Sequence, residues 1–469
     1  MVAIDPAKVR SATGYLASWL AFRQRYLRVP GVQAALLHDD QIALSTAHGH
    51  ADVERDVPLT PEHLFRVASH SKTFTATAVL QLAEAGRLRL DDRVGTWLPE
   101  LADAGADSAD VTLRDLLNHT AGLVRDGRDG DHWQLQRPFP GADGVRALAA
   151  LGRVIEPNQR FKYSNVGYSL LGLVIEAASG QSYHDYVVEH VVAPLGLTRT
   201  GPELDPARSS DYATGYSALS YARERIAIPH VDTAAMAAAT GFYSTAEDLC
   251  RYASAHFPGD DRLVGDASKR VMQHEWWQVE GIEDSFYGLG FSIVKVGDRR
   301  LVGHGGGYPG HSTRTMFDPV DRLAISVLTN AIDGPAAPLA TGLVKLLELA
   351  GEIRPAGDPA TAEDSARFCG RLANLWQVQD IALLGGRLYL VDPAADDPTE
   401  VTTRLDIVDG RRLRISDTSG YGSFGEELEF DFAADGAIVS VRGGSGMTWW
   451  PLDRFDVAAL LNSAGGGTA

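Results

Sequence analysis

The sequence predicts an α/β (α+β) chain, in which an antiparallel sheet flanked by helices and a mostly α-helical region are followed by a small all-β barrel domain. Three observations support this prediction. Strand patterns stand at both ends of residues 1–352, helical periodicity fills the middle of that stretch, and strand patterns alone follow residue 364. The length of 469 residues exceeds what one hydrophobic core usually supports, so two domains are expected.

The first elements along the chain are a helix, a hairpin and a second helix. Apolar residues at helical spacing predict a helix over Pro6–Tyr26. Two apolar runs on either side of Asp39 and Asp40 predict a β-hairpin that begins the sheet. Good helix formers over residues 69–88, with Gly86 as the stop, predict the strongest helix of the chain.

The later elements of the first domain return from helix to strand. Residues 91–258 mix helical stretches with loops rich in Gly, Pro and Asp, and are expected to be mostly α-helical. Short β runs over residues 287–331 predict a meander, and residues 338–351 predict a closing helix. This order suggests that both ends of the domain complete one antiparallel sheet, with the helix from Ser69 packed against it.

Composition divides the chain into four segments. Residues 1–352 form the first domain, and residues 353–364, rich in Pro, Ala and Asp, indicate a linker. Residues 365–461 alternate apolar and polar residues between Gly-containing turns, which predicts the barrel. The last residues, 462–469, have nothing to bury and are expected to be mobile.

Charge and cysteine content exclude several classes of function. The formal net charge of −18 argues against nucleic acid or an anionic membrane surface as a partner, since both require clustered Lys and Arg. Cys250 and Cys369 lack the spacing of a zinc site or a redox pair. No secretory signal and no uncharged 18-residue apolar stretch is visible, which favours a cytoplasmic protein without a membrane span.

Ser69 and Lys72 form the first chemical motif, at the start of the strongest predicted helix. Only six of the 43 Lys and Arg residues are lysines, so a lysine at this position is a specific signal. The spacing places both side chains on one helix face, where the amine can act as base or stabilise an anion as a cation. The N–H groups of the helix start, that of Ser69 included, could hold an oxyanion. By itself, the motif also fits a lysine that faces solvent.

Tyr163 and Asn165 form the second motif, directly before another predicted helix. A phenol has an ordinary pKa of about 10, and an adjacent Lys72 ammonium would lower that pKa enough to make Tyr163 a base. Asn165 offers a donor and an acceptor, suited to holding Lys72 and a substrate amide oxygen. Taken singly, the two residues fit a packed tyrosine and a capping asparagine equally well.

His304 and the three glycines after it form the third motif, behind a predicted strand. Glycines such as Gly305 and Gly306 permit a substrate backbone to approach a strand closely, and a free N–H there could complete an oxyanion hole. His304 could orient or protonate groups at the site, although a single histidine is more often structural. With Gly310 the glycines also match a dinucleotide-binding spacing, but no helix follows, so such a site is not expected.

Together the motifs resemble those of the serine β-lactamase and penicillin-binding-protein family, in the order found in class C β-lactamases and their relatives. The motifs are Ser69-x-x-Lys72, Tyr163-x-Asn165 and His304-x-Gly306. Surrounding stretches such as LRDLLNHTAGL and YSNVGYSLLGL are also similar to this family. The resemblance covers about residues 30–350, and it implies a β-lactamase/transpeptidase-like fold for the first domain.

The resemblance also implies a role for each residue of the motifs. Ser69 would be acylated, while Lys72 and Tyr163 would shuttle protons. Asn165 would position the substrate, and the N–H groups of Ser69 and Gly307 would hold the oxyanion. No metal and no cofactor is implied.

One departure separates this chain from many members of the family. Many penicillin-binding proteins and β-lactamases have a lysine where this chain has His304, and a histidine is more like the pattern of D-aminopeptidases, alkaline D-peptidases and esterases. A neutral histidine would not offer a substrate carboxylate the permanent cation of a lysine. The C-terminal barrel fits the same relatives, whose barrels are lipocalin-like, and is expected to brace the first domain or shape the site entrance.

The expected function is that of a serine hydrolase that forms an acyl-enzyme on amides or esters, most of all D-amino-acid-containing peptides or amides and small esters. The partner would be a small-molecule or peptide substrate. Three alternatives stay open. They are a penicillin-binding-type thioesterase, which as a peptide cyclase would release nonribosomal peptides from a carrier protein, a β-lactamase, and a non-catalytic binding protein on the same fold. Selectivity would lie in loops such as residues 124–141.

Overall fold

The computed structural model describes residues 5–351, 365–419, 422–443 and 446–465. Packing divides the chain into two compact units. The first is Leu27–Ala340, and the second combines Val2–Tyr26 with Thr341–Ala469. The predicted linker, 353–364, lies outside the described residues, so the domain boundary placed there stays a prediction.

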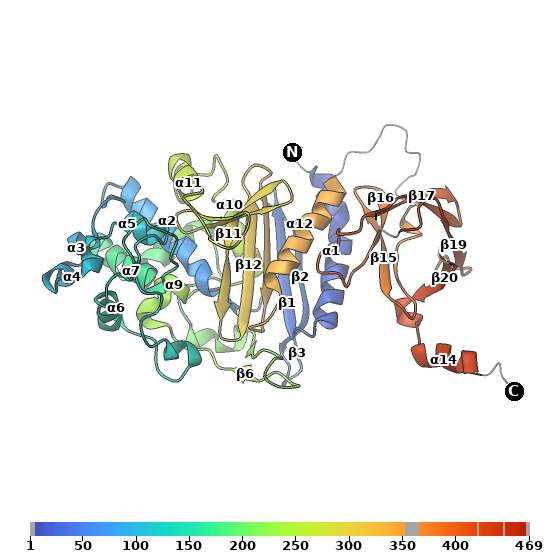
Figure 1. The fold of residues 1–469 in the computed structure, drawn as a ribbon, viewed down its shortest axis with the longest axis horizontal. Coiled ribbons are helices and arrows are strands. Elements are labelled where there is room, and N and C mark those ends of the chain that lie inside the picture. The colour runs from blue at the N-terminus through green and yellow to red at the C-terminus, as the bar shows by residue number, and fades with distance from the viewer. Residues whose placement is uncertain (1–4, 352–364, 420–421, 444–445, 466–469) are drawn as a thin grey trace. The chain divides into compact units, whose positions relative to one another are not determined.

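A nine-stranded sheet forms the centre of the first unit and confirms the predicted antiparallel sheet (Figure 1). Its order is β3-β2-β1-β13-β12-β11-β10-β9-β8. The strands are β1 Gly31–His38, β2 Gln41–Asp52, β3 Val57–Pro58, β8 Trp277–Gln278, β9 Ser285–Tyr287, β10 Ser292–Val296, β11 Arg299–Tyr308, β12 His311–Asp318 and β13 Leu323–Thr329. Strand β1 pairs with β13, so that Val32 lies opposite Thr329 and the two ends of the unit meet in one sheet, as expected.

The predicted hairpin turns at Asp39 and Asp40, whose φ angles are 48° and 61°. Two successive residues in the left-handed region give the tight hairpin turn whose twist matches that of the strands. Helix α10, Ala246–Ser254, packs on β1, β12 and β13. The buried Cys250 lies in this layer, with its Sγ 3.5 Å from the carbonyl oxygen of Ala35, and fills space as a small apolar residue.

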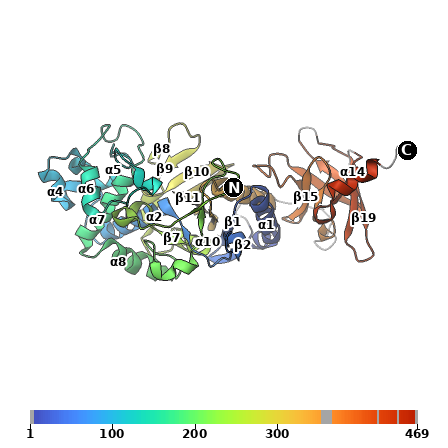
Figure 2. The ribbon, with the colours of Figure 1, turned by 90° about the horizontal axis from the view of Figure 1, so that it is seen from below.

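A helical region lies beside the sheet within the first unit (Figure 1), and Figure 2 shows α2 and α7 next to each other. Its helices are α2 Ser71–Glu84, α3 Val94–Trp97, α4 Pro99–Asp103, α5 Leu113–Leu117, α6 Ala142–Ala149, α7 Asn165–Ser179, α8 Tyr183–Val187, α9 Ala237–Thr240 and α11 Asp266–Met272. Eleven of the 14 residues of α2 are buried, because α2 packs against both α7 and α9. The predicted helical middle of the chain is thus present, with two short two-stranded sheets, β4 Phe65–Arg66 with β7 Tyr243–Ser244 and β5 Gly215–Tyr216 with β6 Ala227–Ile228.

The predicted helix over residues 69–88 is shorter in the structure. Ser69 lies in a 3₁₀ turn, η1 Ala68–His70, and α2 begins at Ser71. Gly86 follows the helix with a φ of 67°, a left-handed conformation that glycine adopts without strain, so it acts as the stop that the sequence predicts.

The second unit contains a closed eight-stranded barrel, which confirms the predicted all-β domain (Figure 1). Its strands are β14 Gly370–Ala373, β15 Val378–Leu384, β16 Arg387–Val391, β17 Thr403–Asp409, β18 Arg412–Asp417, β19 Glu427–Phe432, β20 Ile438–Arg442 and β21 Thr448–Pro451. Helix α1, Pro6–Tyr26, has the predicted bounds and packs on β15, where Tyr15 donates a hydrogen bond of 3.0 Å to Asp380. Helix α12, Ala336–Gly351, contacts the same helix through Gly342, which lies against the ring of Trp19.

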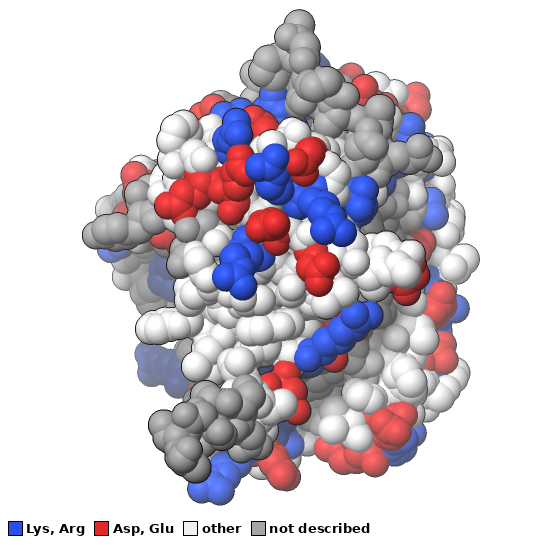
Figure 3. Space-filling model, turned by 90° about the vertical axis from the view of Figure 1, so that its right-hand side faces the viewer, with Lys and Arg blue, Asp and Glu red and all other residues white. Residues whose placement is uncertain are grey.

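Helix α14, Val457–Gly465, is the last described element, so residues 462–465 of the predicted mobile tail are helical. Residues 466–469 lie outside the described residues. On the face shown in Figure 3, Lys and Arg side chains lie among Asp and Glu side chains. Within the described part of the chain, no helix combines the length and the apolar character needed to cross a bilayer.

Candidate active site

Ser69 lies where the helical region meets the sheet. It occupies the turn η1, which contacts β11 and leads into α2. Ala68, directly before it, has a φ of 46°, a left-handed conformation that costs energy for a residue with a Cβ. Strained backbone of this kind occurs where the surrounding structure fixes a functional group, here the hydroxyl of Ser69.

Two side chains from separate elements reach the Oγ of Ser69. Lys72, one turn along the chain, places its Nζ 3.1 Å away, as the i to i+3 spacing predicts. The hydroxyl of Tyr163, which lies just before α7, donates a hydrogen bond of 2.9 Å to the same oxygen. The structure therefore brings a hydroxyl, an amine and a phenol into mutual contact.

Lys72 is fully buried, and within the described part of the chain no carboxylate contacts it directly. Besides Ser69, its Nζ donates a hydrogen bond of 2.7 Å to the backbone carbonyl of Ala239, and it lies 4.8 Å from the ring centroid of Tyr163. Burial lowers the pKa of Lys72 well below its ordinary value, and Asp126 at longer range offsets only part of that effect. The amine can therefore be neutral, as a general base requires.

The pKa of Tyr163 is raised above its ordinary value. The sequence led us to expect that Lys72 would lower this pKa and make Tyr163 a base, and that expectation is wrong. Burial in this wall of the site disfavours the phenolate and outweighs the hydrogen bond to Ser69 and the nearby Arg125, which both act to lower the pKa. The ammonium of Lys72 was expected to stabilise the phenolate, but burial disfavours that ammonium too. Tyr163 therefore holds its proton in the resting site.

Asn165 is the first residue of α7, whose N-cap Ser164 accepts a hydrogen bond from the N–H of Gly167. Its Nδ2 donates a hydrogen bond of 2.7 Å to Asp126, and its buried Oδ1 has no hydrogen-bond partner in the described structure. Asn165 therefore does not hold Lys72, contrary to the expectation. Its free Oδ1 is left as an acceptor at the edge of the site.

His304 lies on β11 with both ring nitrogens occupied. Nδ1 lies 2.6 Å from the carbonyl oxygen of Gly305 and Nε2 lies 3.0 Å from the hydroxyl of Tyr287, so the neutral ring donates through Nδ1 and accepts through Nε2. Burial, reinforced by Lys72, keeps the pKa of His304 well below its ordinary value. The histidine is neutral, as expected, and it does not line the cavity that contains Ser69.

The three glycines of β11 have different surroundings. A Cβ on Gly306 would lie 2.1 Å from the carbonyl oxygen of Val67. The absence of a side chain at Gly306 therefore makes room for the turn before Ser69, whereas the sequence led us to expect a substrate backbone there. Gly305 would tolerate a Cβ at ordinary contact distance from Thr313. Gly307 has no atom within 4 Å of such a Cβ and lines the cavity.

A cavity of about 400 Å³ opens beside Ser69. Its lining residues are Ser69, Arg125, Asp126, Trp133, Tyr163, Asn165 and Gly307. Arg125, Asp126 and Trp133 were not predicted as site residues, although they belong to the loop 124–141 that was expected to set selectivity. In the sequence, only their charge and aromatic character could have indicated a role in the site, because no motif has a fixed spacing between that loop and the other site residues.

Asp126 is the centre of this part of the lining. Its Oδ1 accepts hydrogen bonds from Asn165 and, at 3.0 Å, from the indole N–H of Trp133. Arg125 lies 3.3 Å from the other carboxylate oxygen and 5.2 Å from the ring centroid of Tyr163. The side chain of Asp126 is 16% exposed and that of Arg125 is 66% exposed, so a mostly buried carboxylate and an exposed cation both line the cavity. Among the described residues, no three His, Cys, Asp or Glu side chains gather as a metal site.

Comparisons with known proteins agree with the motifs. Over 297 residues the chain is 33% identical to Penicillin-binding protein 4* of Bacillus subtilis strain 168, and this match covers 60% of the chain but only 64%, less than two thirds, of that protein. The octameric penicillin-binding protein homologue from Pyrococcus abyssi has the same fold, with a TM-score of 0.65 and 23% identity, covering 93% of this chain and 99% of that one.

The D-amino acid amidase from Ochrobactrum anthropi SV3 is a second structural neighbour. Its TM-score is 0.60 at 25% identity, and the match covers 71% of this chain and 95% of that one. A family model described as Beta-lactamase matches residues 21–348, which is more than half of the chain and includes all three motifs. The chain therefore belongs to the Beta-lactamase family.

Proposed function

We propose that this protein is a serine hydrolase in which Ser69 forms an acyl-enzyme with amides or esters of D-amino acids. One observation carries the proposal: the Oγ of Ser69 contacts both Lys72 and Tyr163 in the wall of a cavity. A serine hydroxyl is a weak nucleophile and needs such a base within hydrogen-bond reach. Membership of a family whose structural neighbours include an amidase supports a hydrolase.

The resting hydrogen bonds suit a neutral Lys72. The Nζ of Lys72 donates to the carbonyl of Ala239 and lies 3.1 Å from the Oγ of Ser69, to which Tyr163 donates. A neutral amine has a lone pair that would receive the proton of Ser69 across this distance. Lys72 then takes the proton of Ser69 as the Oγ attacks the substrate carbonyl carbon. The new C–O bond forms while the carbonyl becomes an oxyanion, which the N–H groups of Ser69 and Gly307 would stabilise.

Collapse of this intermediate breaks the bond to the leaving amine or alcohol. Tyr163 gives its proton to the leaving atom, and the proton on Lys72 passes to the phenolate, so that both groups return to their neutral forms. A water molecule then enters in place of the leaving group. It gives a proton to the same pair and attacks the acyl carbon, and Ser69 leaves with its proton restored.

Asp126 supports a substrate that carries an ammonium group. Asn165 and Trp133 hold this carboxylate at the cavity wall, and a free α-amino group would pair with it in place of the exposed Arg125, which lies 3.3 Å away. The neutral His304 offers no cation to a substrate carboxylate. An amino acid amide or ester has a free ammonium and no carboxylate, which fits this pair of features, and the likeness to a D-amino acid amidase supports the D configuration.

The acyl-enzyme can be tested by mass spectrometry of the intact protein after treatment with a fluorophosphonate. We expect one adduct per chain, located on the peptide that contains Ser69, and no adduct on the Ser69→Ala variant. Wild-type protein that stays unmodified, or a variant that is modified equally, would rule out the proposal.

Substrate class is tested with D- and L-alaninamide, p-nitrophenyl butyrate, nitrocefin and a peptidyl thioester. We expect turnover of D-alaninamide to exceed that of L-alaninamide by at least about tenfold, a difference of about 1.4 kcal/mol in activation free energy. Faster turnover of nitrocefin would indicate a β-lactamase instead. Release of a cyclic product from the thioester would replace hydrolysis with cyclisation.

A further inference from the structure

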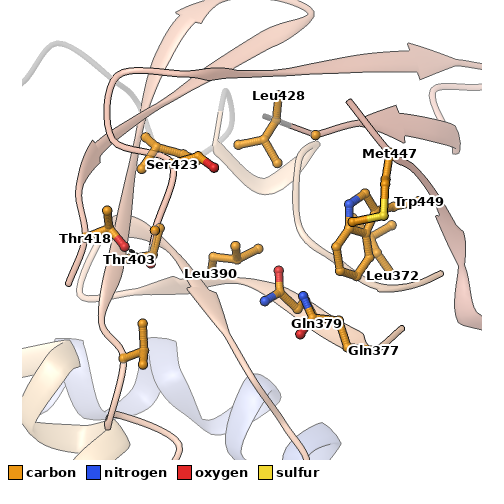
Figure 4. A pocket seen from close by; sticks show the side chains of 14 residues that line it. Leu372, Gln377, Gln379, Leu390, Thr403, Thr418, Ser423, Leu428, Met447 and Trp449 are labelled. Carbon is orange, nitrogen blue, oxygen red and sulfur yellow. Dashed lines mark hydrogen bonds between the residues drawn. The ribbon is translucent and has the colours of Figure 1, made fainter. Parts of the chain in front are cut away.

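The barrel of the second unit contains a cavity that the proposed hydrolysis does not use (Figure 4). It encloses about 270 Å³, and an apolar cavity of roughly 150 Å³ is already large enough to hold benzene. Its lining residues are Leu372, Gln377, Gln379, Leu390, Val401, Thr403, Ile415, Thr418, Gly422, Ser423, Leu428, Gly443, Met447 and Trp449.

Two strands break their apolar pattern where they reach this cavity. On β15, residues two apart share a face, so Gln379 points inward with Ile381, a residue of the barrel core. On β17, Thr403 shares the inward face with Leu405, which belongs to the same core. The barrel interior is thus apolar along most of its length and carries polar side chains at one end.

The polar groups at this end are available for hydrogen bonding. Within the described residues, the side-chain amide of Gln379 and the indole N–H of Trp449 have no hydrogen-bond partner, while Thr403 and Thr418 pair with each other at 2.8 Å. Gln379 is half-buried and Trp449 is 7% exposed. A half-buried amide without a partner costs stability unless water or a ligand bonds to it.

Apart from Gln377 and Ser423, the rest of the lining is apolar side chains and glycine, and no lining residue carries a charge. Figure 4 shows Leu390, Gln379 and Trp449 around the same space, with Leu428 on another side. Burying a charged ligand here would leave its charge unpaired, whereas one amide or carbonyl group can pair with Gln379. The lining therefore selects for an uncharged molecule with one polar end.

We propose that this cavity binds an uncharged amphipathic small molecule. Its apolar body, one or two fused rings in size, packs between Leu390, Leu428 and Trp449, and its carbonyl or amide group bonds to Gln379. All residues of the site belong to the barrel, so a test of this proposal does not depend on the chemistry at Ser69.

The probe for this site is prodan, a naphthalene dye that is uncharged and carries one carbonyl group. Titration of the full-length protein should give saturable binding with a blue shift of the dye emission, because the rings leave water. Two variants, Leu390→Trp and Met447→Trp, fill the cavity from different sides and should each weaken binding by at least about tenfold. Val439→Trp is the matched control, since Val439 is a 38% exposed barrel residue outside the lining, and it should change affinity by less than about twofold.

Gln379→Leu tests the hydrogen bond separately. Loss of one neutral hydrogen bond should weaken prodan binding by about fivefold while the blue shift persists. Thermal unfolding of each variant establishes that it is folded, and the Met447 variant, which changes a 38% exposed side chain, keeps the test valid if Leu390→Trp does not fold. Absence of saturable binding to the wild type, or unchanged binding to a folded cavity-filling variant, would overturn the proposal.

Discussion

Lys72 and Tyr163 both contact the Oγ of Ser69, and burial moves their pKa values in opposite directions. Burial disfavours whichever form of a group is charged, which is the ammonium of Lys72 and the phenolate of Tyr163. Burial therefore favours a neutral amine beside a neutral phenol. These directions agree with the roles that we propose, in which Lys72 is the base and Tyr163 is the proton donor.

The pH profile of kcat/KM tests the assignment of Lys72. A base must be deprotonated, so activity should be low in acid and rise with pH through the pKa of Lys72, which burial places well below its ordinary value. Lys72→Arg is the control, because a guanidinium stays charged at every accessible pH. It should lose roughly 10²- to 10⁴-fold in kcat. Retained activity in that variant would show that Lys72 supplies charge alone.

Tyr163→Phe removes the proposed proton donor and keeps the ring. We expect a loss of roughly 10²- to 10⁴-fold in kcat for an amide, whose leaving amine needs a proton. The loss should be smaller for p-nitrophenyl butyrate, since p-nitrophenolate leaves without protonation. Steady-state kinetics on both substrates checks this prediction, and an equal loss on the two would assign Tyr163 a different step.

Asp126→Asn tests the proposed ammonium site. The substitution keeps the shape of the side chain and removes its charge, so it should raise KM for D-alaninamide by about tenfold, as expected for one charge-assisted hydrogen bond. N-acetyl-D-alaninamide, which has no ammonium, should be affected much less. If both substrates lose equally, then Asp126 acts by holding Asn165 and Trp133 in place.

Local patterns in the sequence predicted much of the fold. Strand alternation and the turn at Asp39 and Asp40 predicted the hairpin, and helix formers between Ser69 and Gly86 predicted α2, apart from the 3₁₀ turn that begins it. That turn depends on contact with β11, which is distant in sequence, so local periodicity carries no sign of it.

The sequence predicted the parts of the site that are formed by motif residues. Ser69 and Lys72 meet because they are three positions apart across the turn η1 and the start of α2. The backbone carbonyl of Ala239 leaves no signature in a sequence, since every residue has one, so the second partner of Lys72 could not be predicted. The direction of the Tyr163 pKa depends on burial from several elements, which spacing alone does not report.

Buried neutral histidines predict a loss of stability in acid. Burial lowers the pKa of His70 and of His230 to about 4 and that of His256 further, whereas an unfolded histidine has a pKa of about 6.5. Between those values the unfolded chain binds protons that the folded chain does not. The free energy of unfolding should therefore fall as the pH drops below about 6.5, by up to about 1.4 kcal/mol per pH unit for each such histidine.

Urea unfolding at a series of pH values measures this slope. His256→Gln removes one buried histidine and should make the slope shallower, while His274→Gln, which changes an exposed histidine, is the matched control. A wild-type stability that is constant from pH 7 to about pH 5 would contradict the prediction.

The neighbouring glycines of β11 offer a matched pair of substitutions. A Cβ on Gly306 would lie 2.1 Å from the carbonyl of Val67 and 2.5 Å from the hydroxyl of Thr313, so Gly306→Ala forces β11 away from the turn that holds Ser69. We expect it to lower the free energy of unfolding by roughly 1–3 kcal/mol, as overpacking does, and to slow fluorophosphonate labelling.

Gly307→Ala adds the same methyl group one residue later, where no atom lies within 4 Å. Its stability should stay within about 0.5 kcal/mol of the wild type, because nothing is displaced. Gly307 lines the cavity, so any effect of this variant should fall on substrate binding and raise KM. Urea unfolding and labelling kinetics of the two variants therefore distinguish two effects. One is the packing of β11 against the turn that contains Ser69, and the other is the shape of the cavity. Equal destabilisation by both would mean that the contact with Val67 is not the reason for the glycine at position 306.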